Sequence, residues 1–349
     1  MLNYNPSTIS EEEIFTLSAE GRLKLYLDLE QADLGVKEIE RLTGDASTRQ
    51  YFRVFCANTD TLIASVYQEA FDQITHPFCD VTKLFLAAKL PVPKIVAVSG
   101  RFAIMLMQDL GDIRLQDWLV TVSQKQYKAA YQEAISLILA IQNATNQAYQ
   151  QDSISSRLAF DEAKLIWELD FFYQHYFHSY LQATLTLKQE TALKTELQTI
   201  ASELAARPRV LCHRDFHSRN LMLYQGKQYI IDHQDARMGP QSYDIASLLR
   251  DPYVDLSEEM IEELYQFFVD QKIAVGATLE WVKEMRLEFE LMTVQRILKA
   301  IGTYAYQTAI VKNNVYVPYI PRAIATVLAA AKRLGRFSVL CEMLINYQK

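Results

Sequence analysis

The chain has 349 residues, half of them hydrophobic, which is enough for one large domain or two ordinary domains with a substantial core. Its formal net charge is −7 and no basic stripe occurs, so neither nucleic acid nor an anionic membrane surface is an expected partner. The 10 glycines and 9 prolines are too few for long disordered or low-complexity stretches.

The four cysteines form no Cys-x-x-Cys pair, and their spacing fits neither a disulfide framework nor a zinc ribbon. They are Cys56, Cys79, Cys212 and Cys341. Free thiols are typical of a reducing compartment. The N-terminal sequence lacks the basic and apolar regions of a signal peptide, and no stretch approaches the roughly 18 apolar residues of a membrane span. We therefore expect a cytoplasmic protein.

The first hundred residues predict a helix followed by a small, mostly antiparallel sheet. Apolar residues at Leu23, Leu27 and Leu34 repeat with helical spacing over 19–34. Aromatic and β-branched runs between turn residues then predict strands. These strands are expected over 39–42, 51–55, 61–67, 94–98 and 102–107. A helix with one apolar face is expected over 80–89, between the third and fourth strands.

The sequence changes character at residues 108–112, and from Leu115 onward it predicts mainly helices. These helices are expected over 127–143, 160–180, 187–206, 257–271, 277–305 and 321–347. We therefore predict an α+β fold with two lobes. The N-lobe (1–107) holds the small antiparallel sheet, 108–112 forms a hinge, and 113–349 forms a larger, mainly helical C-lobe.

A polar loop in the second lobe carries the residue types of a phosphoryl-transfer site. It runs from His213 to Asn220. Asp232 lies twelve residues further on, directly after the apolar run 228–231. Asp215 is a carboxylate that can accept the proton of a hydroxyl, and Asn220 and Asp232 offer oxygen ligands that a hard divalent cation prefers. A base and two metal ligands acting on a magnesium nucleotide are the parts that phosphoryl transfer needs. The spacing therefore predicts a small-molecule kinase, with His213 bracing the loop.

Two other interpretations of this loop stay open. It can be a solvated loop of ordinary turn residues, although the full His-Arg-Asp, Asn and Asp spacing is unusual for one. It can also be a zinc site, because His213 and His217 are four residues apart and His233 is close in sequence. However, Arg214 stands where a zinc-peptidase helix has its glutamate, and the segment reads as a loop.

Small residues between the first two strands form a candidate nucleotide loop. The segment Gly44, Asp45, Ala46, Ser47, Thr48, Arg49 lets backbone N–H groups approach an anion, and Arg49 and Arg53 add positive charge. The same pattern is also common in plain hairpin turns. No Gly-x-x-x-x-Gly-Lys-Ser/Thr motif occurs, so the chain is not a Walker-type ATPase.

The loop from His213 to Asn220, followed by Ile230, Ile231 and Asp232, resembles the motif of the aminoglycoside phosphotransferase and choline kinase superfamily. Its members are similar in fold to protein kinases. Within it, the chain looks most like the bacterial anomeric kinases of N-acetylmuramate and N-acetylglucosamine, which act in cell-wall sugar recycling. This likeness extends over about residues 20–325 and rests on the segments 44–54, 108–112, 239–251 and 295–302.

The resemblance implies an ATP-dependent and Mg²⁺-dependent kinase that phosphorylates the anomeric hydroxyl of an amino sugar. It implies that Asp215 is the catalytic aspartate, that Asn220 and Asp232 hold magnesium, and that Asp244 braces the catalytic loop. It also implies that residues 44–53 contact the nucleotide. The hinge residues Gln108, Asp109 and Leu110 would then pair with adenine through their backbone.

The acceptor, a small molecule with a hydroxyl group, is expected to bind in the second lobe near the catalytic loop. Candidate contacts are Asp235, Arg250 and Arg296, although each can equally be a surface charge or part of an internal ion pair. Other acceptors in the same superfamily are aminoglycosides and choline. The tyrosine-rich segment 167–180 is more typical of a core than of a ligand platform, but it can be mistaken for the aromatic cage that choline would need, so choline stays open.

One departure from the kinase pattern concerns the third strand. Typical kinases hold the α- and β-phosphates with a lysine there, but 61–70 contains none, and no lysine or arginine lies between Arg53 and Lys83. The anomeric sugar kinases tend to lack this lysine as well. We hypothesise that Arg49 and the amides of 45–48 replace it. The alternative is a nucleotide-binding pseudokinase, against which the intact set of Asp215, Asn220 and Asp232 argues.

Overall fold

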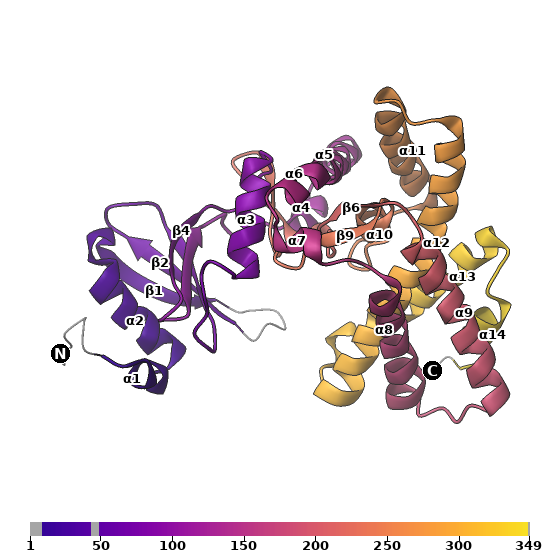
Figure 1. Ribbon diagram of the computed structural model, residues 1–349, viewed down its shortest axis with the longest axis horizontal. Coiled ribbons are helices and arrows are strands. Elements are labelled where there is room, and N and C mark those ends of the chain that lie inside the picture. Colours follow the sequence, from indigo (N-terminus) through magenta and orange to yellow (C-terminus); the bar gives the residue numbers. More distant parts are fainter. Residues whose placement is uncertain (1–8, 43–48, 348–349) are drawn as a thin grey trace. The chain divides into compact units, whose positions relative to one another are not determined.

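The computed structural model describes residues 9–42 and 49–347, which fall into two units. The first unit contains Met1–Asp112 and Met222–Gln234, and the second contains Ile113–Leu221 and Asp235–Lys349. Figure 1 labels many of the helices and strands and colours the chain along its sequence.

The first unit is built on a five-stranded antiparallel sheet with the strand order β1-β2-β3-β5-β4. Its strands are β1 (Val36–Leu42), β2 (Gln50–Cys56), β3 (Leu62–Val66), β4 (Ile95–Ser99) and β5 (Ile104–Gln108). Their bounds lie within about three residues of the expected strands. Alternation explains this agreement: Phe52 and Val54 of β2 are buried on one face, while Tyr51 and Arg53 point to the other.

Four short helical segments accompany the sheet. They are α1 (Glu11–Thr16), α2 (Ala19–Glu30), the 3₁₀ turn η1 (Ala32–Leu34) and α3 (Pro77–Ala87). The helix expected over 19–34 ends at Glu30, because the cap residue Gln31 leaves the helical conformation (φ −134°). Gly35, in the left-handed conformation (φ +60°), closes the following turn η1. In turn, α3 begins three residues before its expected start, since Pro77 suits the first turn of a helix.

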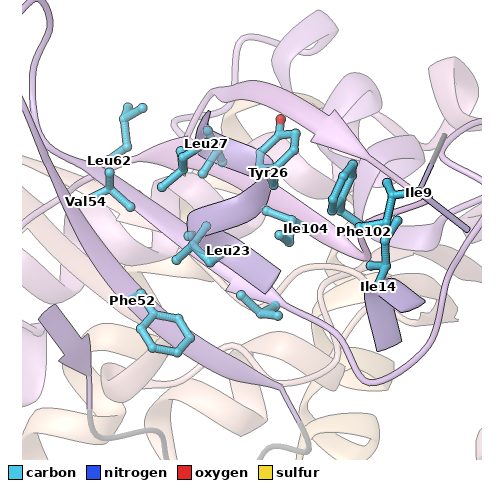
Figure 2. Packing of buried hydrophobic residues seen from close by; sticks show 13 residues of the cluster. Ile9, Ile14, Leu23, Tyr26, Leu27, Phe52, Val54, Leu62, Phe102 and Ile104 are labelled. Atoms are coloured by element: carbon cyan, nitrogen blue, oxygen red, sulfur yellow. The ribbon is translucent and has the colours of Figure 1, made fainter. Parts of the chain in front are cut away.

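The core of the first unit lies between α2 and one face of the sheet. Figure 2 shows Leu23, Tyr26 and Leu27 of α2 facing side chains of β2, β3 and β5. Fully burying one such side chain contributes about 1.5–3 kcal/mol. A smaller cluster on the opposite face contains Phe78 of α3 with Met105 and Met107 of β5.

A hairpin within the second half of the sequence belongs to the first unit. It consists of β7 (Leu221–Tyr224) and β8 (Lys227–Ile230), joined by Gln225 and Gly226 in the left-handed conformation that a tight hairpin requires. The backbone N–H of Ile230 donates to the carbonyl of Pro91 at 2.7 Å. The expected C-lobe (113–349) included this hairpin, whereas the structure places Met222–Gln234 in the first unit. The hydrophobic pattern of a segment does not indicate a contact with a residue as distant as Pro91.

The second unit is mainly helical. Its helices are α4 (Leu115–Leu119), α5 (Gln124–Asn143), α6 (Thr145–Gln150), α7 (Ile154–Arg157), α8 (Glu162–Phe172), η2 (Tyr173–Tyr180), α9 (Leu187–Ala205), η3 (Ser218–Asn220), α10 (Tyr243–Leu249), α11 (Glu258–Ala274), α12 (Leu279–Tyr306), η4 (Gln307–Val311), η5 (Asn314–Tyr319), α13 (Ile320–Leu334) and α14 (Ser338–Asn346). Among the residues described, no helix combines the length and apolarity needed to cross a membrane.

Two expected helices are each divided. The single helix expected over 321–347 is α13 followed by α14, because Gly335 adopts φ +64° and the N–H of Arg336 closes the helix end on the carbonyl of Ala331. The helix expected over 160–180 is α8 continued by the wider π-helical turn η2. Local periodicity does not distinguish these cases from one long helix.

Two buried elements place the candidate loop. Strand β6 (Arg209–Cys212) pairs antiparallel with β9 (Arg237–Pro240), and the polar loop starts where β6 ends. All seven residues of α10 are buried. The long helix α12 packs so closely on α8 that a Cβ at Gly302 would lie 2.7 Å from the Cα of Phe172. Near this close approach, Gln295 and Lys299 of α12 contact Glu168 of α8.

Candidate active site

A buried carboxylate holds the start of the loop. Asp244 of α10 accepts the backbone N–H groups of His213 at 2.7 Å and of Arg214 at 3.1 Å. Burial raises the pKa of Asp244, although His213 and the two N–H donors oppose this rise. Arg214 has φ +89°, a conformation that costs a non-glycine residue on the order of 1–3 kcal/mol. The two hydrogen bonds thus stabilise a strained turn directly before Asp215.

Asp215 lies in this loop, with its side chain 28% exposed, among positive side chains. Its Oδ1 lies 3.3 Å from Arg296 and 3.4 Å from Lys299, which are three residues apart on α12. Its Oδ2 lies 3.8 Å from Nε of Arg214, beyond hydrogen-bonding distance. Burial alone would raise the pKa of Asp215, but the charges of Lys299, Arg296 and Arg214 hold it well below its usual range. At neutral pH the group is a carboxylate.

Lys299 also contacts a second, fully buried carboxylate. Its Nζ lies 3.7 Å from Oε1 of Glu168 on α8, whose Oε2 accepts a hydrogen bond from Gln295 at 2.8 Å. Neither Lys299 nor Glu168 was among the expected site residues. Lys299 lies in the segment 295–302 that carried part of the resemblance, whereas no local pattern connects Glu168 with Asp215.

A cavity of about 120 Å³ opens beside Asp215 within the second unit. Its wall combines positive side chains, hydroxyl groups and aromatic rings around this carboxylate. They include Ser247, Arg250, Tyr253, Arg296, Lys299, Thr303 and Tyr304. Hydroxyls and rings suit a polyol such as a sugar, and the positive charges favour a neutral or anionic molecule over a cation.

The three candidate acceptor contacts differ in their surroundings. Arg296 contacts Asp215 and donates to Oγ of Ser247 at 2.7 Å, so it forms part of the cavity wall. Arg250 also lines the cavity, but its guanidinium pairs with Glu258 at 2.6 Å. Asp235 pairs with Arg214 at 3.0 Å and does not line this cavity.

Asn220 is oriented by the backbone of the same loop. Its Nδ2 donates to the carbonyl oxygen of Asp215 at 2.9 Å, so the amide group is fixed with its oxygen directed elsewhere. The preceding turn is anchored by Asp251, which accepts hydrogen bonds from the N–H and the hydroxyl of Ser218. A fixed amide oxygen is a suitable ligand for a hard cation.

In the first unit, Asp232 follows the β7–β8 hairpin with φ +60° and its side chain 43% exposed. Its Oδ1 accepts a hydrogen bond from Gln234 at 2.9 Å and lies 3.7 Å from the guanidinium of Arg49. That guanidinium lies 5.7 Å from each of the ring centroids of Tyr51 and Tyr67. The expected nucleotide loop residues Gly44, Asp45, Ala46, Ser47 and Thr48 lie outside the described residues.

The expected hinge is fastened by an arginine from β2. Arg53 pairs with Asp109 at 2.8 Å and with Asp112 at 2.7 Å. Asp109 also accepts the backbone N–H of Gly111, and Leu110 is buried, while Gln108 is the last residue of β5. Arg53 therefore contacts the two hinge aspartates, whereas Arg49, directly before β2, approaches Asp232.

The histidines do not gather into a metal site. His233 is fully buried, lies 2.6 Å from Oγ1 of Thr82 and packs against the rings of Phe78 and Phe85. Within residues 9–42 and 49–347, no group of three or more histidine, cysteine, aspartate or glutamate side chains is arranged to hold a metal ion. The zinc interpretation of the loop thus finds no ligand set there.

The fold is that of kinases with two lobes. A choline/ethanolamine kinase family protein from Mesorhizobium loti superposes with a TM-score of 0.60 and 16% identity, covering 93% of this chain and 98% of its own. The ADP-bound aminoglycoside phosphotransferase APH(2'')-Ib superposes with a TM-score of 0.58 and 15% identity, covering 90% of this chain and 99% of its own. These likenesses confirm the expected α+β architecture of an antiparallel N-lobe and a mainly helical C-lobe.

Residues 38–275 match the phosphotransferase enzyme family, and the chain belongs to this family. It is 29% identical over 305 residues to an N-acetylmuramate/N-acetylglucosamine kinase of Neisseria meningitidis, covering 86% of this chain and 88% of the relative. It is 27% identical over 325 residues to a kinase of the same name from Pseudomonas putida, covering 93% and 92%. The expected resemblance to these sugar kinases is confirmed.

Proposed function

We propose that this protein is an ATP-dependent and Mg²⁺-dependent kinase that phosphorylates the anomeric hydroxyl of N-acetylmuramate or N-acetylglucosamine, as in cell-wall sugar recycling. The observation that carries the proposal is the Asp215 carboxylate, held on one oxygen at the wall of a polar and aromatic cavity. The named activity of the relatives that span most of the chain supports the choice of acceptor.

Asp215 orients the acceptor hydroxyl. Its Oδ2 accepts a hydrogen bond from the sugar hydroxyl and takes its proton as the new bond forms. In that step the sugar oxygen bonds to the γ-phosphorus, the bond between this phosphorus and the bridging oxygen breaks, and ADP leaves with the electron pair. A carboxylate with a lowered pKa passes the proton on readily to solvent, which suits a group that mainly positions the hydroxyl.

The nucleotide contacts belong to the sheet and the hinge. Backbone groups of Gln108, Asp109 and Leu110 would pair with adenine, and the segment from Gly44 to Arg49 would cover the phosphates. Arg49 takes the place of the missing third-strand lysine, because it is the guanidinium beside Asp232. The rings of Tyr51 and Tyr67 support it from β2 and the end of β3, so its charge is held in place rather than solvated.

The donor set fits magnesium. Asn220 offers an amide oxygen whose nitrogen is already bonded, and Asp232 offers a carboxylate that is partly exposed. Magnesium commonly takes one or two protein oxygens and completes its shell with phosphates and water. When bound, the ion neutralises charge on the phosphates. Asn220 and Asp232 would hold it, and Arg49 would add a further positive charge.

The other acceptors fit less well. Aminoglycosides are polycations and choline is a quaternary ammonium ion, whereas the cavity beside Asp215 is lined by Arg250, Arg296 and Lys299. The pseudokinase alternative requires a decayed site, but Asp215, Asn220 and Asp232 are all present.

An ADP-release assay with N-acetylmuramate, N-acetylglucosamine, glucose, choline and kanamycin tests the proposal. We expect turnover with the two N-acetylated sugars and little with choline or kanamycin. Selective turnover of kanamycin or choline would contradict the proposed acceptor class. Binding of Mg-ATP without turnover of any acceptor would favour the pseudokinase.

A further inference from the structure

Glu168 and Lys299 form a charged cluster next to Asp215, and removing these two charges from water costs free energy of folding. Glu168 is 1% exposed and the side chain of Lys299 is 15% exposed, although each carries a charge that water would stabilise. Buried ion pairs rarely stabilise a fold more than apolar side chains of the same size would. Stability alone therefore does not account for the pairing of a buried Glu168 with a half-buried Lys299 between α8 and α12.

The side chains of the cluster form a chain of contacts that ends at Asp215. Glu168 is fixed at one end by Gln295, Lys299 lies in the middle, and the Oδ1 of Asp215 lies at the other end. A lysine side chain is flexible and normally hydrated, so a buried carboxylate behind it restricts where its ammonium group can lie. The anchored ammonium group can in turn restrict the rotation of the Asp215 carboxylate.

Arg296 is not the only cation that contacts Oδ1 of Asp215 among the residues that the structure describes. Its guanidinium is shared between Asp215 and the hydroxyl of Ser247. Lys299 lies one turn further along α12 and approaches the same oxygen. Two cations on Oδ1 restrict the rotation of the carboxylate, whereas the nearest recorded cation to Oδ2 is Arg214 at 3.8 Å.

We propose that Lys299, anchored by Glu168, is a positioning residue that holds the Asp215 carboxylate by Oδ1 and presents Oδ2 to the acceptor hydroxyl. This inference rests on the proposed role of Asp215. Lys299 does not replace the missing third-strand lysine. Lys299 acts on the acceptor side of the reaction, and Arg49 acts on the nucleotide side. A misplacement of about 1 Å at a reacting group can cost about 100-fold in rate.

Kinetics of four variants test the inference. In Lys299→Met, which keeps most of the length of the side chain without its charge, kcat should fall about 100-fold with the KM values for sugar and ATP nearly unchanged. Lys299→Arg should recover most of the lost kcat. Glu168→Gln should lose about 10-fold, because the neutral amide holds the lysine more weakly than the carboxylate does. Lys283→Met, an exposed lysine on the same helix, is the control and should behave as the wild type.

Crystal structures of the variants give a second readout that needs no acceptor. The Asp215 carboxylate should rotate or move in Lys299→Met and keep its place in Lys299→Arg. An unmoved carboxylate with wild-type kcat in Lys299→Met would overturn the inference, as would equal inactivity of both Lys299 variants with Asp215 in place. If Lys299→Met does not fold, the structure and kcat of Glu168→Gln decide. If the wild type phosphorylates no sugar, the proposed function fails, while the crystal structures still test the positioning.

Discussion

The guanidinium of Arg49 lies 3.7 Å from the carboxylate of Asp232, although the two residues are far apart in the sequence. Arg49 stands at the entry to β2, and Asp232 follows the β7–β8 hairpin of the same unit. A kinase whose third strand has no lysine therefore still has a positive side chain beside its proposed metal-binding aspartate. We propose that Arg49 supplies to the nucleotide phosphates the positive charge that this lysine supplies in typical kinases.

Replacing Arg49 tests this explanation. A hydrogen bond to a charged group contributes about 1.5–3 kcal/mol, so in Arg49→Ala kcat/KM for ATP should fall roughly 10- to 100-fold. Arg49→Lys should recover part of the loss, because it keeps the charge but not the flat guanidinium between the tyrosine rings. Initial rates at varied ATP concentration measure the effect, with the exposed Arg41→Ala in β1 as the control. Unchanged ATP kinetics in Arg49→Ala would show that other groups hold the phosphates.

Magnesium dependence should follow Asn220 and Asp232. Chelating divalent cations with EDTA should stop phosphoryl transfer, and added Mg²⁺ should restore it. In Asn220→Ala and in Asp232→Asn, the Mg²⁺ concentration for half-maximal rate should rise by about 10-fold or more. The first variant loses an oxygen ligand, and the second loses the negative charge of a ligand. Asp255→Asn removes a carboxylate that is 87% exposed and is the matched control. The wild-type Mg²⁺ dependence in both site variants would remove them from the metal site.

Asp244→Asn should weaken both the fold and the activity. The neutral amide accepts only one of the two N–H groups of His213 and Arg214 with the original geometry. Leaving a buried donor unpaired costs about 1–3 kcal/mol, so the free energy of unfolding should decrease by that amount. Denaturant titration measures this loss, and kcat should fall because the turn before Asp215 is released. The exposed Asp270→Asn should leave both quantities unchanged, whereas a stable Asp244→Asn with full activity would refute the bracing role.

The sheet and most helices could be predicted from local sequence, because alternation and helical spacing are written in adjacent residues. The alternating burial of β2 and the apolar face of α5 (Ala130, Ala134, Ile138, Ile141) are examples. The division of the last helix depends on the left-handed Gly335, and α2 ends at Gln31, whose backbone leaves the helical conformation. Hydrophobic periodicity does not detect such single-residue changes. The loop from His213 to Asn220 could be found because its functional residues are close in sequence.

Other parts of the site depend on contacts between distant segments. Lys299 contacts both Glu168 and Asp215 where α8 and α12 pack closely near Gly302. Arg250, expected as a possible acceptor contact, pairs with Glu258, and Arg53, expected at the phosphates, fastens the hinge. No single segment carries a signal for such pairings, so they emerge only from the folded chain.

The most direct test of the whole account is transfer of the γ-phosphate of ATP to N-acetylmuramate, followed by ³¹P NMR with wild type and Asp215→Asn side by side. We expect the wild type to produce a phosphate ester at the anomeric carbon. Since general-base residues contribute about 10²- to 10⁴-fold, Asp215→Asn should be slower by a factor in this range while it still binds Mg-ATP. Equal rates in the two proteins, or an ester at another carbon, would contradict the account.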